Sequence, residues 1–151
     1  MDMRQFTEKS RQALGAAQDI AARLGHQQVD VEHLALALAR QEGGLVPRLL
    51  EKMEIRTGAY EQALEQDLRK KPSVSGSGSG ELSLAPRLHR LLLRAQDTAR
   101  GMKDEFVSVE HIFLEMTTEG GGTVIGKVNG IFGITKDKLL QAMSAVRGNQ
   151  R

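Results

Sequence analysis

A segment of this chain occurs twice, and this duplication limits the folds that the sequence can adopt. Residues 6–38 align with residues 84–116 when the sequence is shifted by 78 positions, and ten of the 33 aligned pairs are identical. The clearest match aligns the run VDVEH at 29–33 with the run VSVEH at 107–111. Solenoid repeats have periods of about 20–50 residues. A period of 78 therefore indicates one duplicated helical bundle rather than a stack of small units.

Apolar residues in both copies follow the 3.6-residue period of an amphipathic helix. The pattern covers residues 6–24 in the first copy and 84–102 in the second. Thr7 is a residue type that caps a first helical turn, and Pro86 is tolerated only in such a turn. Each copy is therefore predicted to open with a long helix.

The rest of each copy is predicted to form three shorter helices. Asp30 and Ser108 can cap the second helix of each copy, after short extended pieces at 28–29 and 106–107. No other strand is predicted. Glycines then interrupt the chain before a third helix, predicted at 45–52 and 124–129, and the fourth helix begins near residue 56 or 135. The sequence thus predicts an all-α fold, a pseudo-twofold duplicated four-helix repeat of about eight helices in one compact domain.

Composition divides the chain into two repeats and a linker. Serine and glycine alternate within residues 72–81, which is typical of a flexible connection. We therefore assign residues 1–71 to the first repeat and 82–146 to the second, and we expect 147–151 to begin a linker to a further module.

Composition also excludes several classes of function. The chain has no cysteine, so no disulfide or thiolate chemistry is available. The formal net charge is +2 with both signs interspersed, so we expect no nucleic acid as a partner. The N-terminus lacks the apolar stretch of a signal peptide, and no apolar run approaches the ~18 residues of a membrane helix. We expect a cytoplasmic protein that does not bind membranes.

Histidines do not form a metal-binding pattern. His33 and His111 have no histidine four residues further along. The preceding residues, Glu32 and Glu110, would point about 100° away on a helix, which is unsuitable for chelation. We predict no metal ligand and expect both histidines to have a structural role at the start of the second helix.

An enzymatic alternative rests on residues 121–128. Their spacing matches a phosphate-binding loop as far as Lys127, but position 128 is valine where a magnesium-binding Ser or Thr is required, and the preceding segment is predicted to be helical. The carboxylates of Asp104, Glu105 and Glu110 cluster in the sequence without an identifiable nucleophile. We predict no catalytic residue and keep a nucleotide-binding enzyme as an alternative, which a Lys127→Ala variant would test.

Some apolar residues lie off the predicted core faces. Leu36 and Leu114 are off the apolar stripe of the second helices, which we explain by burial of those helices on several sides. Leu93 lies about 180° from the apolar face of its helix, where the first copy has Gly15. Exposed apolar groups often mark binding surfaces, so Leu93 is a candidate binding residue.

Several motifs together resemble the Clp N-terminal domain. They are FTEKS at 6–10, QEGG at 41–44, the joining stretch at 72–80, LAPRL at 84–88 and VSVEH at 107–111. The QEGG form, the long Ser-Gly linker and the loop DEFVS that starts at Asp104 look most similar to the ClpB-type disaggregase branch. The resemblance covers nearly the whole chain.

This resemblance implies a domain at the front of a longer, ATP-driven, homohexameric chaperone. Such chaperones extract polypeptides from aggregates together with the DnaK chaperone system. The family's ATPase motifs are absent from this sequence, so ATP and magnesium would bind other modules and this fragment would hold no cofactor. By position, the family's substrate-handling polar residues match Thr7, Asp104 and Glu110.

We therefore expect a non-enzymatic, monomeric module that binds unfolded or aggregated proteins. The binding site would be a groove between the two halves, aliphatic and rimmed by carboxylates, in which Leu93 joins Thr7, Asp104 and Glu110. One alternative is an adaptor-docking domain of a peptidase-linked unfoldase, which would bind a folded partner. Another is a dimeric structural module.

Overall fold

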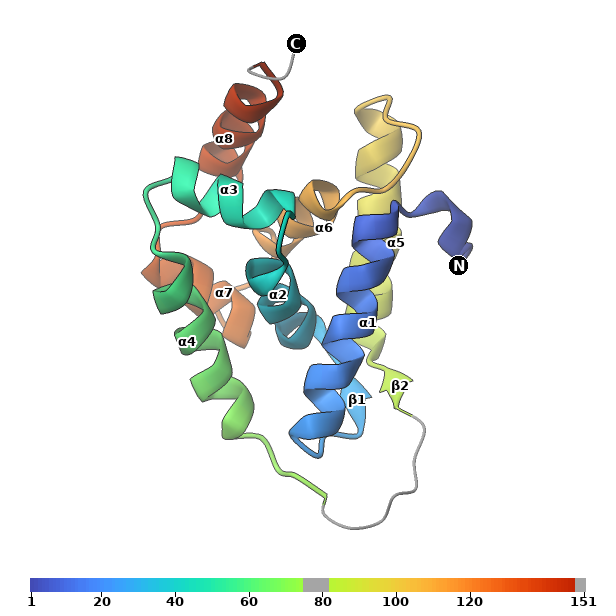
Figure 1. Ribbon diagram of the computed structural model, residues 1–151, viewed down its shortest axis with the longest axis vertical. Coiled ribbons are helices and arrows are strands. Elements are labelled where there is room, and N and C mark those ends of the chain that lie inside the picture. The colour runs from blue at the N-terminus through green and yellow to red at the C-terminus, as the bar shows by residue number, and fades with distance from the viewer. Residues whose placement is uncertain (75–81, 149–151) are drawn as a thin grey trace.

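The computed structural model describes residues 1–74 and 82–148, which form eight α-helices and two short strands (Figure 1). The first repeat contains the 3-10 helix η1 (Met3–Gln5), α1 (Glu8–Arg23), β1 (Gln28–Val29), α2 (Val31–Arg40), α3 (Leu45–Lys52) and α4 (Thr57–Arg69). The second contains β2 (Ser83–Leu84), α5 (Pro86–Gly101), α6 (Val109–Met116), α7 (Val124–Ile131) and α8 (Lys136–Gly148). The predicted all-α class and duplicated four-helix organisation are confirmed.

The helix boundaries agree closely with the sequence patterns. The Thr7 side chain accepts a hydrogen bond from the Ser10 amide at 3.1 Å, and Pro86 occupies the first turn of α5. Most of the predicted linker lies outside the described residues. Helix α8 continues through Gly148, so the first two residues of the linker predicted at 147–151 are helical. Within the described residues, no helix is both long and apolar enough to cross a membrane.

The second helix of each repeat lies at the centre of the molecule. All residues of α2 from Val31 to Ala39 are buried, and so is every residue of α6. Leu36 and Leu114 are accordingly almost fully buried, as predicted. Figure 1 shows α2 between α1 and α4, and the same helix also contacts α5, α6 and α7 of the second repeat. One continuous core therefore serves both repeats.

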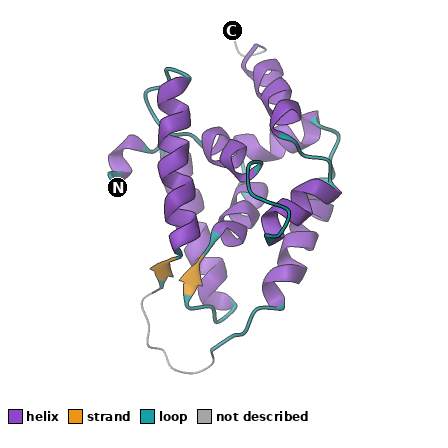
Figure 2. Ribbon diagram, turned by 180° about the vertical axis from the view of Figure 1, so that it is seen from behind, coloured by secondary structure: helices purple, strands orange, loops and turns teal. Residues whose placement is uncertain are grey.

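Short strands connect the repeats reciprocally. Strand β1 pairs in parallel with β2, with Val29 opposite Leu84, and Figure 2 shows the two strands side by side. Phe6 forms a parallel bridge with Val107. Shifting the Phe6–Val107 pair by the repeat period gives Leu84 and Val29, so the two pairings are pseudo-twofold equivalents. Strand β2 was not predicted, because its partner strand lies in the other repeat. Its two residues are also too few to show the alternation of apolar and polar side chains that is typical of a strand.

The third and fourth helices are also exchanged between repeats. Helix α3 packs against α8, and α4 packs against α7. The buried hydroxyl of Tyr60 in α4 donates a 2.7 Å hydrogen bond to the Asn129 side-chain oxygen of α7. Asn129 in turn donates to the Met116 carbonyl at the end of α6. Each repeat thus completes the core of the other.

A buried carboxylate illustrates this mutual dependence. Glu32 is 1% exposed, and one of its oxygens accepts a 3.0 Å hydrogen bond from the Ile125 amide at the start of α7. Arg87 of α5 donates to both Glu32 oxygens at 3.3 Å. A buried charge must be paired and hydrogen-bonded to be tolerated. All of these partners come from the second repeat.

We expect the two repeats to fold only together. A chain of residues 1–74 and a separate chain of residues 82–148 should each be largely unfolded alone, because each would expose the apolar face that the other covers. Mixed in equimolar amounts, they should recover the helical circular dichroism of the intact domain. Stable, cooperative folding of either fragment alone would contradict this expectation.

Gly126 allows a close approach within the second repeat. A β-carbon at this position in α7 would overlap the carbonyl of Gly120 in the preceding turn. We expect Gly126→Ala to lower the free energy of unfolding by about 1–3 kcal/mol, as overpacking does, measured by urea denaturation. Gly130→Ala in the same helix is the control: nothing lies within 4 Å of the place that its methyl group would take, so the higher helix propensity of alanine should raise stability by up to about 1 kcal/mol.

Candidate functional site

Thr7 joins the start of α1 to the loop that precedes α6. Its amide donates a 3.0 Å hydrogen bond to the Val107 carbonyl, and its hydroxyl donates to the Ser10 hydroxyl at 2.9 Å. Ser10 then donates to the same Val107 carbonyl at 3.0 Å. Thr7 therefore lies beside the loop that carries Asp104, although it belongs to the first repeat.

Asp104 and Glu110 meet through Arg147. The Arg147 guanidinium lies 3.0 Å from an Asp104 oxygen and 2.7 Å from a Glu110 oxygen. Arginine suits such a pair because its planar fork presents several donors at once. Sequence reasoning missed Arg147, because its partners lie 37 and 43 positions away.

His111 fixes the position of Asp104. Its Nδ1 accepts a 2.8 Å hydrogen bond from the Ser108 amide, so its proton lies on Nε2, which is 2.7 Å from an Asp104 oxygen. Burial opposes ionisation of Asp104, but the hydrogen bond from His111 and the Arg147 guanidinium outweigh it and hold the pKa of this carboxyl below its usual value. The predicted structural role of His111 is confirmed, since it completes the capping box of α6.

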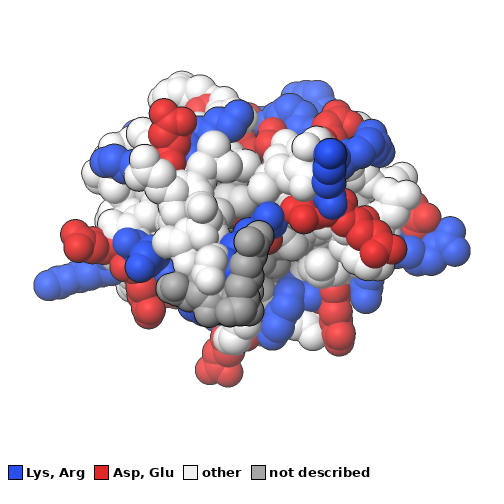
Figure 3. Space-filling model, turned by 90° about the horizontal axis from the view of Figure 1, so that it is seen from above, with Lys and Arg blue, Asp and Glu red and all other residues white. Residues whose placement is uncertain are grey.

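A hollow of about 380 Å³ lies beside this cluster. Its apolar lining comes from Met102 at the end of α5 and from Leu140 and Met143 of α8, and Arg147 stands at its edge. Seen from above, this end of the molecule shows basic and acidic side chains interspersed with uncharged surface (Figure 3). The groove was predicted between the two halves, whereas these lining residues all belong to the second repeat.

Two apolar side chains outside the hollow are exposed. Leu93 is 40% exposed on α5 and points away from the core that Leu91 and Leu92 enter; it does not line the hollow beside Arg147. Phe106 is 47% exposed in the loop after Asp104. Phe106 is not among the predicted site residues. Its neighbour Val107 is buried, and side chains alternate along an extended piece, so the position of Phe106 on the outer side could have been predicted.

The equivalent position in the first repeat has different chemistry. His26 aligns with Asp104, and its Nδ1 lies 2.8 Å from His33 Nε2. The Asp30 amide donates to His33 Nδ1 at 2.9 Å, so His33 carries its proton on Nε2 and donates it to His26. Two neutral imidazoles are paired here, where the second repeat has an imidazole and a carboxylate.

Residues 120–127 form a turn and the first part of α7. The preceding segment is α6 rather than a strand, and Lys127 pairs with Asp67 of α4 at 3.5 Å. The strand–loop–helix context that a phosphate-binding loop requires is therefore missing. Within the described residues, no group of three or more potential ligand side chains (His, Cys, Asp or Glu) is placed to hold a metal ion.

The sequence pattern of the Clp repeat (R) N-terminal domain family matches residues 5–126. The chain belongs to this family. The ClpB chaperone of Nitratidesulfovibrio vulgaris is 51% identical over 153 aligned residues, which include the whole chain but only 18% of the chaperone. This Clp N-terminal domain therefore spans less than a fifth of the curated relative it matches.

Solved structures show the same fold. The Hsp104 N-terminal domain from Candida albicans has a TM-score of 0.81 at 21% identity, covering 97% of this chain and 94% of that one. The N-domain in a complex of ClpV with a VipB peptide has a TM-score of 0.72 at 19% identity, covering 91% of this chain and 83% of that one. The expected resemblance to Clp N-terminal domains is confirmed.

The paired histidines make stability sensitive to acid. Burial, followed by the nearby His26 and Lys71, lowers the pKa of His33 from 6.5 to about 4, and burial also lowers the pKa of His26. The folded state therefore binds fewer protons than the unfolded state below pH 6.5. Its extra stability is present above that pH and is lost as the pH falls towards 4.

We expect His26→Asp to remove most of this acid sensitivity. The new carboxylate would accept the His33 Nε2 proton, as Asp104 accepts that of His111, and would favour a protonated His33. Urea denaturation between pH 7 and 4 should show a loss of roughly 2 kcal/mol in the native domain that is smaller in the variant. Parallel pH profiles for the two proteins would contradict this explanation.

Proposed function

We propose that this Clp N-terminal domain is a non-enzymatic module that binds unfolded or aggregated polypeptide for a ClpB-type chaperone. The observation that carries the proposal is the methionine-lined hollow beside the carboxylates of Asp104 and Glu110. Methionine is flexible and polarisable and suits surfaces that accept many sequences. Apolar contact is non-directional, so it needs no defined fold in the partner.

Each part of this site would have its own role. Met102, Leu140 and Met143 would take apolar side chains of the client, and the exposed Phe106 and Leu93 would add separate apolar contacts outside the hollow. Asp104 and Glu110 would attract basic segments. Because Arg147 already binds both carboxylates, a basic client side chain must displace it, whereas an apolar segment can enter beside it.

Binding at such a site is expected to be weak. The hollow is small, and an unfolded client loses conformational entropy when it is ordered. Weak binding suits a domain that transfers its client to the ATP-driven modules of its parent. The homohexameric parent and its cooperation with the DnaK chaperone system are part of this proposal.

The alternative of docking to a defined partner has one supporting observation. The similarly folded ClpV N-domain is known in a complex with a VipB peptide. A domain of this kind would bind one segment of one partner at fixed stoichiometry. The proposed site instead combines an adaptable apolar lining with scattered charge, which favours clients of many sequences.

A titration followed by NMR tests the proposal. A protein kept unfolded by reduction and carboxymethylation of its cysteines should shift the resonances of Met102, Met143, Phe106 and Leu93. Leu93→Ser should weaken binding by roughly threefold, as expected for partial loss of one apolar contact.

Charge variants provide the matched comparison. Asp104→Asn should weaken binding of clients rich in arginine and lysine. Asp97→Asn should not weaken it, because Asp97 is an exposed carboxylate on α5 that is paired only with Arg100 among the described residues. A client that shifts no resonance at near-millimolar concentration would exclude direct client binding and favour the docking of a defined partner.

A further inference from the structure

A second hollow lies in the first repeat, between α1 and α2. Its volume is about 370 Å³, and its floor is formed by Ala13, Ala16 and Ile20 of α1 and Ala37 of α2. It shares no lining residue with the hollow beside Arg147. We call this second hollow the α1–α2 groove.

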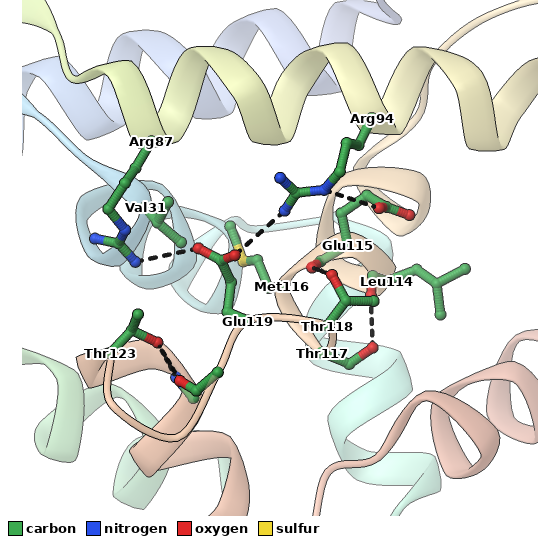
Figure 4. A network of polar contacts seen from close by, with 12 residues as sticks. Val31, Arg87, Arg94, Leu114, Glu115, Met116, Thr117, Thr118, Glu119 and Thr123 are labelled. Atoms are coloured by element: carbon green, nitrogen blue, oxygen red, sulfur yellow. Dashed lines mark hydrogen bonds and ion pairs between the residues drawn. The ribbon is translucent and has the colours of Figure 1, made fainter.

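The equivalent place in the second repeat is filled by the chain itself. Arg94 aligns with Ala16, and Glu115 aligns with Ala37. Arg94 Nε lies 3.5 Å from a Glu115 oxygen, and Arg94 Nη2 lies 3.3 Å from a Glu119 oxygen. Figure 4 shows the Arg94 side chain between α5 and α6, reaching both carboxylates.

Two further lining positions of the groove also differ between the repeats. Leu91 stands where the first repeat has Ala13, and Thr98 stands where it has Ile20. The Thr98 hydroxyl donates a 2.6 Å hydrogen bond to Glu115. The first repeat thus lacks the whole polar unit, both the cation and its acceptors, and the short side chains of Ala13, Ala16 and Ala37 leave the space open.

This difference defines what the α1–α2 groove can accept. In the second repeat the guanidinium is held there by two carboxylates, and the first repeat has Ala37 and Gln41 at those positions. On this apolar floor a charged side chain would lose its hydration without gaining the partners that Glu115 and Glu119 give to Arg94. An aliphatic side chain would bury apolar surface at no such cost.

The rim of the groove carries charges of both signs. Asp19 and Glu42 stand at its edge together with Arg23 and Arg40. Arg40 is already bound to Glu61 and Glu65 of α4, at 3.0 and 2.9 Å. A rim of both signs selects neither an acidic nor a basic partner, so the aliphatic floor decides what binds.

We propose that the α1–α2 groove is a second site for unfolded polypeptide, which it binds through aliphatic side chains. This inference rests on the function proposed above. It adds that the two repeats offer separate sites of different character: one apolar, and one bordered by the Asp104–Glu110–Arg147 cluster. A client with two apolar segments could then occupy both sites, and its overall affinity would exceed that for either site alone.

The second repeat provides the design of the test. The triple variant Ala16→Arg, Ala37→Glu and Gln41→Glu copies Arg94, Glu115 and Glu119 into the first repeat and should fill the groove without unfolding the domain. The probe is a peptide with leucine at alternate positions, and its serine-for-leucine counterpart is the negative control. In the native domain the leucine peptide should shift the methyl resonances of Ala13, Ala16, Ile20 and Ala37.

In the triple variant the peptide should bind the groove about tenfold more weakly, the change expected when one aliphatic side chain loses its burial. Shifts at Met102 and Met143 should persist. Ala22→Arg is the matched control, because it adds an arginine to an exposed position of α1 that does not line the groove. If the triple variant fails to fold, Ala16→Leu tests the same point from a single exposed position.

The outcomes separate this inference from the proposed function. Peptide-induced shifts at Met102 and Met143 with none in α1 and α2 would overturn the second site and leave the proposed function standing. Unchanged affinity in the filled variant would also overturn it. Shifts confined to the α1–α2 groove would support this site and remove the one beside Asp104. An absence of shifts throughout the domain would overturn both.

Discussion

Burial of α2 and α6 is the constraint on which the rest of the structure depends. Neither helix can be covered by its own repeat, because α2 also contacts α5, α6 and α7, and α6 also contacts α1, α2 and α3. The apolar faces must therefore be shared, and the short strands and the third and fourth helices are exchanged to share them. The partners of the buried Glu32 carboxylate all come from the second repeat. The packing of the two repeats therefore depends on a specific polar contact as well as on burial of apolar surface.

A shared core fixes the backbone of both repeats but leaves their outer surfaces independent. Equivalent positions of the two repeats hold a His26–His33 pair in the first repeat and an Asp104–His111 pair in the second. In both, the second histidine accepts the hydrogen bond of the cap residue through Nδ1, so its Nε2 must donate. The acceptor is an imidazole in one repeat and a carboxylate in the other, and only the carboxylate can also bind Arg147. The contact between Asp104 and Arg147 therefore depends on a difference at one aligned position.

The sequence could predict whatever is encoded locally. Helix periodicity and caps such as Thr7 and Pro86 placed the helices to within a few residues, and apolar residues off the stripe of the second helices predicted that Leu36 and Leu114 would be buried. Features that depend on distant partners could not be predicted. Strand β2 forms because β1 supplies its hydrogen bonds, and the position of Arg147 depends on carboxylates that meet it only in the folded chain. The predicted site residues divide in the same way: Asp104 and Glu110 come together and Thr7 lies beside their loop, while Leu93 lies apart from the hollow.

The α1–α2 groove could also have been found in the sequence, but only by comparing the aligned copies. Alanine fits any face of a helix, so Ala16 and Ala37 carry no signal by themselves; the signal is that Arg94 and Glu115 stand at the matching positions. Partly exposed ion pairs contribute only about 0–1 kcal/mol to stability, so loss of the whole pair costs the fold little, whereas loss of one member would leave a charge without its partner. The core is still closed beneath the hollow, because Ala13 and Ala37 on its floor are 1% and 3% exposed. In this duplicated fold the two repeats share the core that provides stability. Each repeat can still acquire its own binding surface.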